Sequence, residues 1–141
     1  MTLEQVLAAI DGRLVSVDAD LSIEVGMACG ADLMSDVLAF THEGTLLLTG
    51  LTNPQVVRTA EMAGITAVVF VRGKVPPAET IALAETKNLP LLASRLTMYE
   101  TCGRLYRAGL PGCGLFELST DSWQQAFGHS IGAETDQEHP V

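Results

Sequence analysis

Three short apolar runs, each followed by a segment with helical patterning, constrain the fold of this chain more than any other feature. The runs begin near residues 46, 67 and 90, so their starts lie 21 and 23 residues apart. They extend from Leu46 to Thr49, from 67 to 71 and from 90 to 93. Continuous apolar runs that alternate with amphipathic helices are typical of parallel strands covered by helices on both faces. The sequence therefore predicts an α/β domain with three layers (α/β/α) and a largely parallel sheet.

Residues that commonly begin and end helices support this prediction. Asn53 stands before Pro54, which places a capping side chain ahead of a proline at the first helical position. Thr97 and Glu100 have the spacing of a capping box. Glycines at 64 and 109 follow the predicted helices, where a left-handed backbone is common. We expect helices over residues 54–63, 77–87 and 98–108.

The two ends of the chain have weaker patterns. A capping box at Thr2 predicts a helix that ends at Gly12. Short strands over 13–17 and 22–29 and a helix over 32–40 are expected before the regular region. Residues 119–127 predict one short helix around Trp123. We expect one domain over residues 1–115 and an extension over 116–141, of which residues 128–141 form a partly disordered acidic tail.

The charge of the chain is uneven. The 141 residues carry a formal net charge of −9. Residues 1–115 hold 12 acidic and 8 basic side chains, whereas residues 116–141 hold 5 acidic side chains and no basic one. A nucleic-acid backbone would be repelled by this balance, so we expect no nucleic-acid partner.

The three cysteines, Cys29, Cys102 and Cys113, are an odd number at wide spacings. They form neither a paired disulfide framework nor a close set of zinc ligands. We therefore expect no metal and no cofactor. The first dozen residues do not resemble a signal peptide, and no stretch approaches the roughly 20 apolar residues that span a membrane. We expect a cytoplasmic protein with no membrane partner.

Four separated segments of the chain resemble the stand-alone members of the DRTGG domain family, over roughly residues 10–110. The segments are Asp32-Leu-Met-Ser-Asp-Val-Leu38, Leu46-Leu-Leu-Thr-Gly-Leu-Thr-Asn-Pro-Gln55, Val69-Phe-Val-Arg-Gly73 and Leu96-Thr-Met-Tyr-Glu-Thr-Cys-Gly-Arg-Leu105. The Asp-Arg-Thr-Gly-Gly string that names the family is absent here, so its role is not carried over.

The resemblance implies a function class. The family is similar to the N-terminal domain of HPr kinase/phosphorylase and is inserted in larger enzymes, including phosphate acetyltransferases and pyrophosphatases with CBS modules. Small stand-alone members tend to be encoded beside iron-only hydrogenase genes. The resemblance thus implies a regulatory or binding module that often forms a homodimer and has no established chemistry.

Polar residues follow each of the three predicted central strands. Ligands of open parallel sheets bind beyond the carboxyl ends of the strands. Hydroxyls, an amide, helix starts and cations converge there, a combination that suits a phosphate or carboxylate group. The predicted ligand-binding residues are Thr49, Gly50, Thr52, Asn53, Arg72, Ser94, Arg95 and Thr97.

The same residue types also have a purely structural interpretation. Thr52, Asn53, Ser94 and Thr97 are common at any helix start, and Arg72 and Lys74 suit a solvated surface. The chain has no Gly-x-x-x-x-Gly-Lys-Ser/Thr loop, since Val75 and Pro76 follow Gly73-Lys74. Phosphotransfer of the HPr kinase type is therefore not expected.

Two function classes remain open. The first is a non-catalytic regulatory module that senses a small anionic metabolite or nucleotide, or docks on an enzyme partner such as an iron-only hydrogenase system. The alternative is a small enzyme that handles a phosphorylated or acyl substrate at the strand ends. The sequence favours the first because it contains no catalytic residues that we identify: no nucleophile–base pair and no set of metal ligands. A mean hydropathy of +0.29 favours a homodimer.

Overall fold

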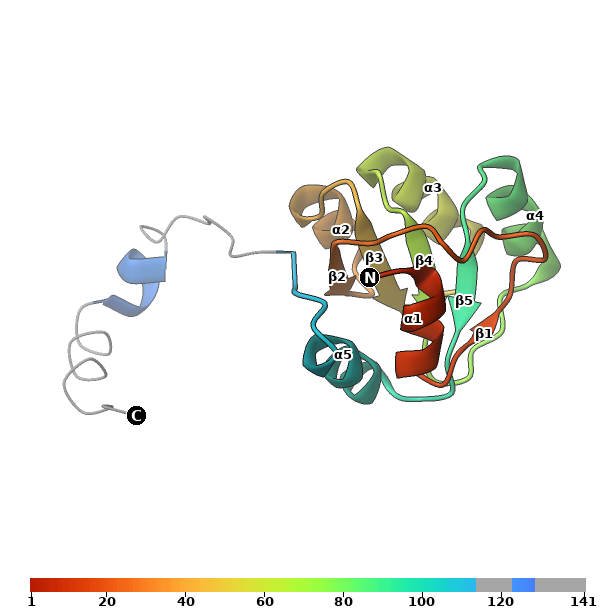
Figure 1. The fold of residues 1–141 in the computed structure, drawn as a ribbon. Helices are drawn as coiled ribbons and strands as arrows, with labels where there is room; N and C mark the ends of the chain where they lie inside the picture. The colour runs from red at the N-terminus through yellow and green to blue at the C-terminus, as the bar shows by residue number, and fades with distance from the viewer. Residues whose placement is uncertain (114–122, 129–141) are drawn as a thin grey trace.

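The computed structural model describes residues 1–113 and 123–128. Within residues 1–113 the chain forms ten elements (Figure 1). They are α1 (Leu3–Ala9), β1 (Arg13–Leu14), β2 (Met27–Gly30), α2 (Met34–Phe40), β3 (Thr45–Thr49), α3 (Pro54–Ala63), β4 (Ala67–Phe70), α4 (Ala78–Thr86), β5 (Leu91–Ala93) and α5 (Met98–Arg107).

The strands form one sheet in the order β1-β5-β4-β3-β2. The four strands from β2 to β5 are mutually parallel, while β1 pairs with β5 in the antiparallel direction. The register aligns Thr49 with Phe70 and Phe70 with Ala93. The carboxyl ends of β3, β4 and β5 therefore lie together at one edge of the sheet, which is at the bottom of Figure 1.

Helices cover both faces of the sheet. Leu46 and Leu48 point to one face, where they pack with buried residues of α1 and α5. Leu47 points to the other face, where it packs with buried residues of α2, α3 and α4. Because consecutive residues of β3 are buried on opposite sides, the strand reads as a continuous apolar run. The predicted three-layer fold with a largely parallel sheet is confirmed.

The predicted helix starts are also found. The Thr2 hydroxyl accepts from the backbone N–H of Gln5, and the Gln5 side chain accepts from the backbone N–H of Thr2. At α3 the Asn53 side chain accepts from the N–H of Gln55, and Gly64 ends the helix with a φ of 73°. These local signals fix where the strands end and the helices begin, and so they position the candidate site.

The C-terminal part is described only over residues 123–128, which are helical. This agrees with the helix predicted around Trp123, whose ring centroid lies 4.8 Å from that of Phe127. The predicted domain boundary at residue 115 and the acidic tail beyond residue 128 lie outside the described residues. In the described part of the chain, no helix has the length and apolar character that a membrane crossing requires.

Candidate functional site at the carboxyl ends of the strands

The fold brings the eight predicted site residues to the carboxyl edge of the sheet. Thr49 is the last residue of β3 and Gly50 follows it, Arg72 follows β4, and Ser94 and Arg95 follow β5. The other three, Thr52, Asn53 and Thr97, lie in the turns that begin α3 and α5. The parallel register thus produces the convergence that the sequence predicted, although the hydrogen bonds show that most of these groups already have partners.

The polar groups after β3 bind a carboxylate of the chain itself. The Thr49 hydroxyl and the Gly50 N–H both donate to Oδ1 of Asp32, over 2.9 and 2.8 Å. Asp32 follows β2, the neighbouring strand in the sheet. Its carboxylate therefore occupies the position at Gly50 where an anionic ligand was expected to approach the backbone.

Ser94 is a buried structural residue. Its hydroxyl donates to the carbonyl of Ile10 over 2.8 Å and accepts from the N–H of Leu96 over 3.2 Å. These bonds join the end of α1 to the turn that follows β5. Both contacts are internal, so the hydroxyl holds the fold at this point.

The remaining polar residues start helices. The Asn53 and Thr97 side chains accept from the N–H groups of Gln55 and Glu100. The Thr52 carbonyl accepts from the Thr80 hydroxyl over 2.7 Å, which connects the α3 start to α4. The structural interpretation of these residue types thus accounts for the hydrogen bonds that they make. Their role in ligand binding stays a prediction.

Arg72 and Arg95 differ from these residues because their guanidinium groups have no hydrogen-bond or ion-pair partner among the described residues. Both side chains are exposed. The backbone at Arg72 is fixed: its φ is 60°, and its N–H donates to the Leu96 carbonyl over 2.7 Å. The next N–H, of Gly73, donates to the Ser94 carbonyl over 2.9 Å. The turn after β4 is therefore bonded to the turn after β5, and it presents Arg72 and Lys74 to solvent.

A further cation, Arg13, was not predicted at this edge. It belongs to β1, and its Cα is paired with that of Ala93 at the end of β5. Only the antiparallel pairing of β1 brings it there, and a two-residue strand gives no sequence signal for its partner. With Arg72, Lys74 and Arg95 it makes four of the chain's eight basic residues. We call these four residues the basic edge.

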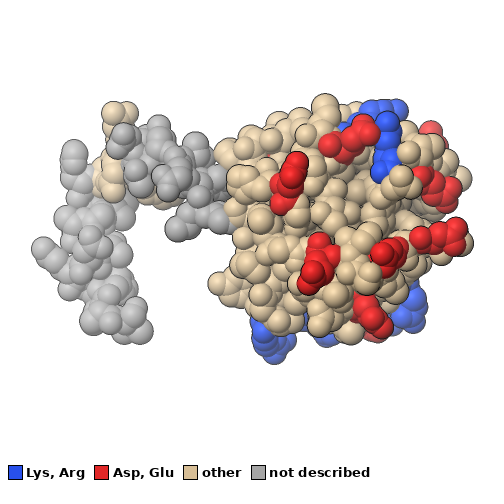
Figure 2. All heavy atoms as spheres, turned by 45° about the horizontal axis from the view of Figure 1, so that its top comes forward, with Lys and Arg blue, Asp and Glu red and all other residues tan. Residues whose placement is uncertain are grey.

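The opposite end of the sheet is acidic. The segments before β2 and β3 carry Glu24 and Glu43, and the ends of α3 and α4 carry Glu61 and Glu85. Figure 2 turns this end toward the viewer and shows acidic side chains spread over it. Basic side chains appear along its lower rim and in one group at the upper right. Lys87 forms an ion pair with Glu61 here, with an N–O distance of 3.1 Å.

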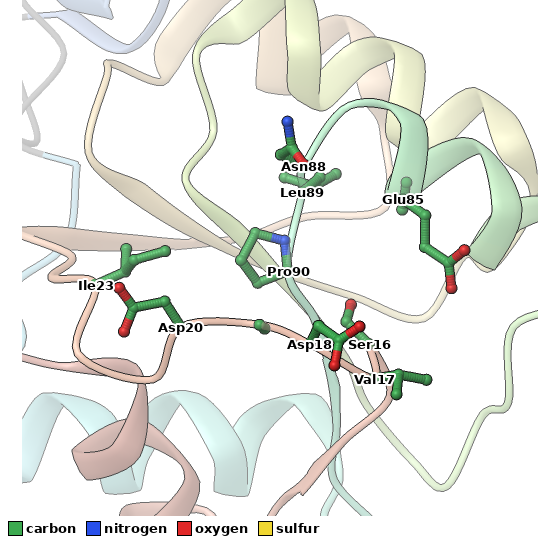
Figure 3. A pocket seen from close by; sticks show the side chains of 11 residues that line it. Ser16, Val17, Asp18, Asp20, Ile23, Glu85, Asn88, Leu89 and Pro90 are labelled. Atoms are coloured by element: carbon green, nitrogen blue, oxygen red, sulfur yellow. The ribbon is translucent and has the colours of Figure 1, made fainter.

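A hollow with a volume of about 450 Å³ lies at this acidic end, between the loop after β1 and the turn from α4 to β5 (Figure 3). Its lining includes the carboxylates of Asp18, Asp20 and Glu85 around Pro90. Hydrogen bonds from the Ser22 hydroxyl and then from its N–H lower the pKa of Asp20, so this group stays charged. The carboxylates that line the hollow therefore make it unsuitable for an anion. No sequence pattern predicted a site there. By charge, an anion is matched better by the basic edge than by this hollow.

The three cysteines, which are far apart in the sequence, gather near β2. Burial, followed by the neighbouring Cys113 and Cys102, raises the pKa of the Cys29 thiol to about 11. Burial also raises the pKa of Cys102, which packs against the core on the α5 side. No group of three or more potential metal ligands with a suitable arrangement occurs within residues 1–113 and 123–128.

These features define a three-layer α/β domain with a basic edge at the carboxyl ends of its strands. The model of the DRTGG domain matches residues 5–108, and the chain belongs to this family. A search of the curated proteins gives no match.

One solved structure extends the comparison. It is the crystal structure of the CBS and DRTGG domains of the regulatory region of Clostridium perfringens pyrophosphatase, complexed with its activator, diadenosine tetraphosphate. The two structures are similar with a TM-score of 0.65 at 14% sequence identity. The match covers 97% of this chain and 60% of that chain, so this chain spans less than two thirds of the regulatory region. The likeness shows the fold.

Proposed function

We propose that this DRTGG domain is a non-catalytic regulatory module that binds a small anionic metabolite or nucleotide at its basic edge. The observation that supports this most directly is that Arg72 and Arg95 are exposed at the carboxyl ends of β4 and β5 and that their guanidinium groups have no partner within residues 1–113 and 123–128. Docking on an enzyme partner, for example in an iron-only hydrogenase system, is a second form of the same regulatory role.

The contacts of the eight predicted residues support two different roles, one structural and one in ligand binding. Thr49, Gly50 and Ser94 are engaged by groups of the chain, so they shape the edge rather than bind. Arg72 and Arg95 hold the charge that a phosphate needs, and arginine binds phosphate in a planar, two-pronged geometry. We therefore propose that the ligand binds on the solvent side of the turns after β4 and β5, near Arg72 and Arg95 and away from Gly50.

The structural neighbour supports a phosphate-rich ligand. Its regulatory region contains a DRTGG domain together with CBS domains and is complexed with a nucleotide that has four phosphates. A ligand with several phosphates would fit the spread of the basic edge over three segments, because each cation could meet a separate charge. Nucleotides with two or more phosphates are accordingly the first probes to use.

Thermal shift followed by calorimetric titration with diadenosine tetraphosphate, ATP, AMP and pyrophosphate tests the proposal. Loss of one charged hydrogen bond costs about 1.5–3 kcal/mol, or roughly ten- to a hundredfold in affinity. We expect Arg72→Ala and Arg95→Ala each to weaken binding by that factor without lowering the melting temperature of the free protein. Arg58→Ala, which removes an exposed cation from α3, is the matched control and should leave affinity within about twofold.

Asp32→Asn distinguishes the basic edge from the predicted Gly50 site. If the ligand lies between Arg72 and Arg95, the loss of the Asp32 charge leaves its affinity unchanged or slightly raised. If the ligand has to displace Asp32 from the Gly50 N–H, the affinity should rise strongly, by about tenfold or more, because the competing anion is gone. Full binding by both arginine variants would contradict the proposal.

The enzyme alternative has a direct test. The protein is incubated with ATP, acetyl phosphate and pyrophosphate, and the release of phosphate is followed over hours. We expect no turnover above the rate without protein. Turnover that Arg72→Ala abolishes and Arg58→Ala preserves would establish the small enzyme in place of the regulatory module.

A further inference from the structure

The edge strand β2 has a second chain segment beside it. Ala28 of β2 pairs in the parallel direction with Gly112, and its N–H donates to the Pro111 carbonyl over 2.9 Å. The sheet order leaves β2 with β3 on one side only, so the segment 110–113 lies along the outer side of the strand. This segment comes directly after α5.

The register of this pairing places two cysteines opposite each other. Cys29 on β2 and Cys113 on the segment 110–113 each lie one residue beyond the Ala28–Gly112 pair. Neighbouring strands lie about 4.8 Å apart, and disulfides form between Cα atoms roughly 4.4–6.8 Å apart. This register implies a Cα–Cα separation within the range that a disulfide spans.

The side-chain contacts agree with this geometry. The Cys113 Sγ donates to the carbonyl of Ala28 over 3.3 Å, so it lies over the peptide that joins Ala28 to Cys29. The same Sγ lies 4.0 Å from the hydroxyl of Thr45. Thr45 of β3 is paired with Met27 of β2. Residues 27 and 29 share one face of β2 because side chains alternate along a strand. Cys113 thus lies on the Cys29 side of the sheet.

Cys102 is placed differently. It belongs to α5 and packs against the core on the other face of the sheet. Its Sγ would lie 2.9 Å from a Cβ built at Gly30. Gly30 and Ala28 share the face opposite to Cys29, so Cys102 contacts β2 from the α5 side. The fold therefore separates one cysteine from the other two and supplies an internal control.

We propose that Cys29 and Cys113 form a reversible disulfide. This modification site would link the segment after α5 covalently to β2, the outermost strand of the sheet. The oxidant is a low-molecular-weight disulfide such as oxidised glutathione. The proposal is independent of ligand binding at the basic edge, which lies beyond the ends of β4 and β5.

The reaction proceeds by two thiol–disulfide exchanges. The Cys113 thiolate attacks one sulfur of oxidised glutathione; a Cys113–glutathione bond forms, the glutathione disulfide bond breaks, and one glutathione thiolate leaves. Cys29 then loses its proton to solvent, and its sulfur attacks Cys113. The Cys29–Cys113 bond forms and the second glutathione leaves as thiolate. Two protein thiols are oxidised, and one glutathione disulfide is reduced to two glutathione molecules.

The electrostatics of the pair set the order of these steps and their pH dependence. Burial and the neighbouring Cys113, Cys102 and Asp36 raise the pKa of Cys29 to about 11. This thiol is therefore protonated near pH 7 and is the second sulfur to react. Below that pKa its thiolate fraction rises about tenfold per pH unit. We expect ring closure to accelerate steeply between pH 7 and pH 9.

The test uses the full chain in glutathione buffers of graded redox potential, quenched with iodoacetamide and analysed by intact mass and peptide mapping. We expect the wild type to lose two alkylatable thiols, to keep Cys102 free and to yield a peptide that links Cys29 to Cys113. Cys102→Ser should close the same bond over the same range of potentials. Closure of this long loop should raise the melting temperature by about 5 °C or more.

Variants of the pair give the opposite result. Cys29→Ser and Cys113→Ser should form no internal disulfide and should accumulate at most a mixed disulfide with glutathione. Melting temperatures measured under reducing conditions check that each variant is folded. Three free thiols in the oxidised wild type, a link that includes Cys102, or a bond between two molecules would overturn the proposal.

Discussion

The Thr49 hydroxyl donates to Asp32 and accepts from the N–H of Leu51 over 3.2 Å, and the Ser94 hydroxyl has the same pair of roles with Ile10 and Leu96. In both cases a buried hydroxyl at the carboxyl end of a strand accepts from the N–H two residues later and donates to a segment distant in the sequence. A hydroxyl has one proton to donate, so each has already used its donor. Residue type alone predicted these positions as ligand contacts; only the three-dimensional partners show that the chain uses them itself.

One buried hydroxyl has no such partner. Thr59 lies in α3 and is fully buried, and its Oγ1 has no hydrogen bond among the described residues. An unsatisfied buried polar group costs about 1–3 kcal/mol. We expect Thr59→Val, which keeps the side-chain shape, to raise the free energy of unfolding by roughly 1 kcal/mol in urea titrations.

Thr80→Val is the matched control, because Thr80 is also a fully buried helical threonine but donates to the Thr52 carbonyl. Its loss should lower the free energy of unfolding by about 1–2 kcal/mol. The same sign of change for both variants would show that side-chain shape, and not the hydrogen bond, decides the stability at these positions.

Among the elements, the regular part of the fold follows from local signals. The helix expected over residues 54–63 is found over Pro54–Ala63, because a cap, a proline and a glycine mark its ends within one segment. The strand expected over residues 13–17 is only Arg13–Leu14 and is antiparallel. Its pairing depends on β5, which lies about 80 residues later, and no local pattern encodes it. Arg13 and the Cys29–Cys113 neighbourhood were missed for the same reason.

The junction between α1 and the sheet carries a prediction at this scale. Ser94 holds the carbonyl at the end of α1, and Ile10 is fully buried there. Ser94→Ala would leave that carbonyl without its partner and should lower the free energy of unfolding by about 1–3 kcal/mol. Ser35→Ala, on the exposed side of α2, should change it by less than about 0.5 kcal/mol, as measured by denaturant titration. Equal effects of the two variants would show that the α1 contact contributes nothing.

On the scale of the whole molecule, the predicted homodimer has a candidate surface. Tyr99, Gly103 and Tyr106 have the i, i+4, i+7 spacing of one helix face on α5. The two tyrosines are 88% and 73% exposed, and no atom of the described part of the chain lies within 4 Å of a Cβ built at Gly103. An open aromatic face with a small residue at its centre allows close approach of a second copy.

Light scattering at tens of micromolar should therefore report a dimer, whose population rises with concentration by mass action. Tyr106→Ser should shift the protein toward the monomer without lowering its melting temperature by more than a few degrees. Met62→Ser, which removes an exposed apolar side chain from α3, serves as the control and should leave the dimer intact. A wild-type monomer throughout this range would contradict the prediction.

The acidic end and the basic edge give the domain an electric dipole, which Asp32, Glu79 and Glu100 near the carboxyl ends of the strands reduce. In the field of an approaching polyphosphate such a molecule experiences a torque that turns the basic edge forward, so a larger share of diffusional encounters begins in a productive orientation. The acidic face, with Glu24, Glu43 and Glu85, repels the same ligand and shortens unproductive contacts. Added salt would screen both effects at distances beyond a Debye length of about 8–10 Å, and it would change the association rate more than the dissociation rate.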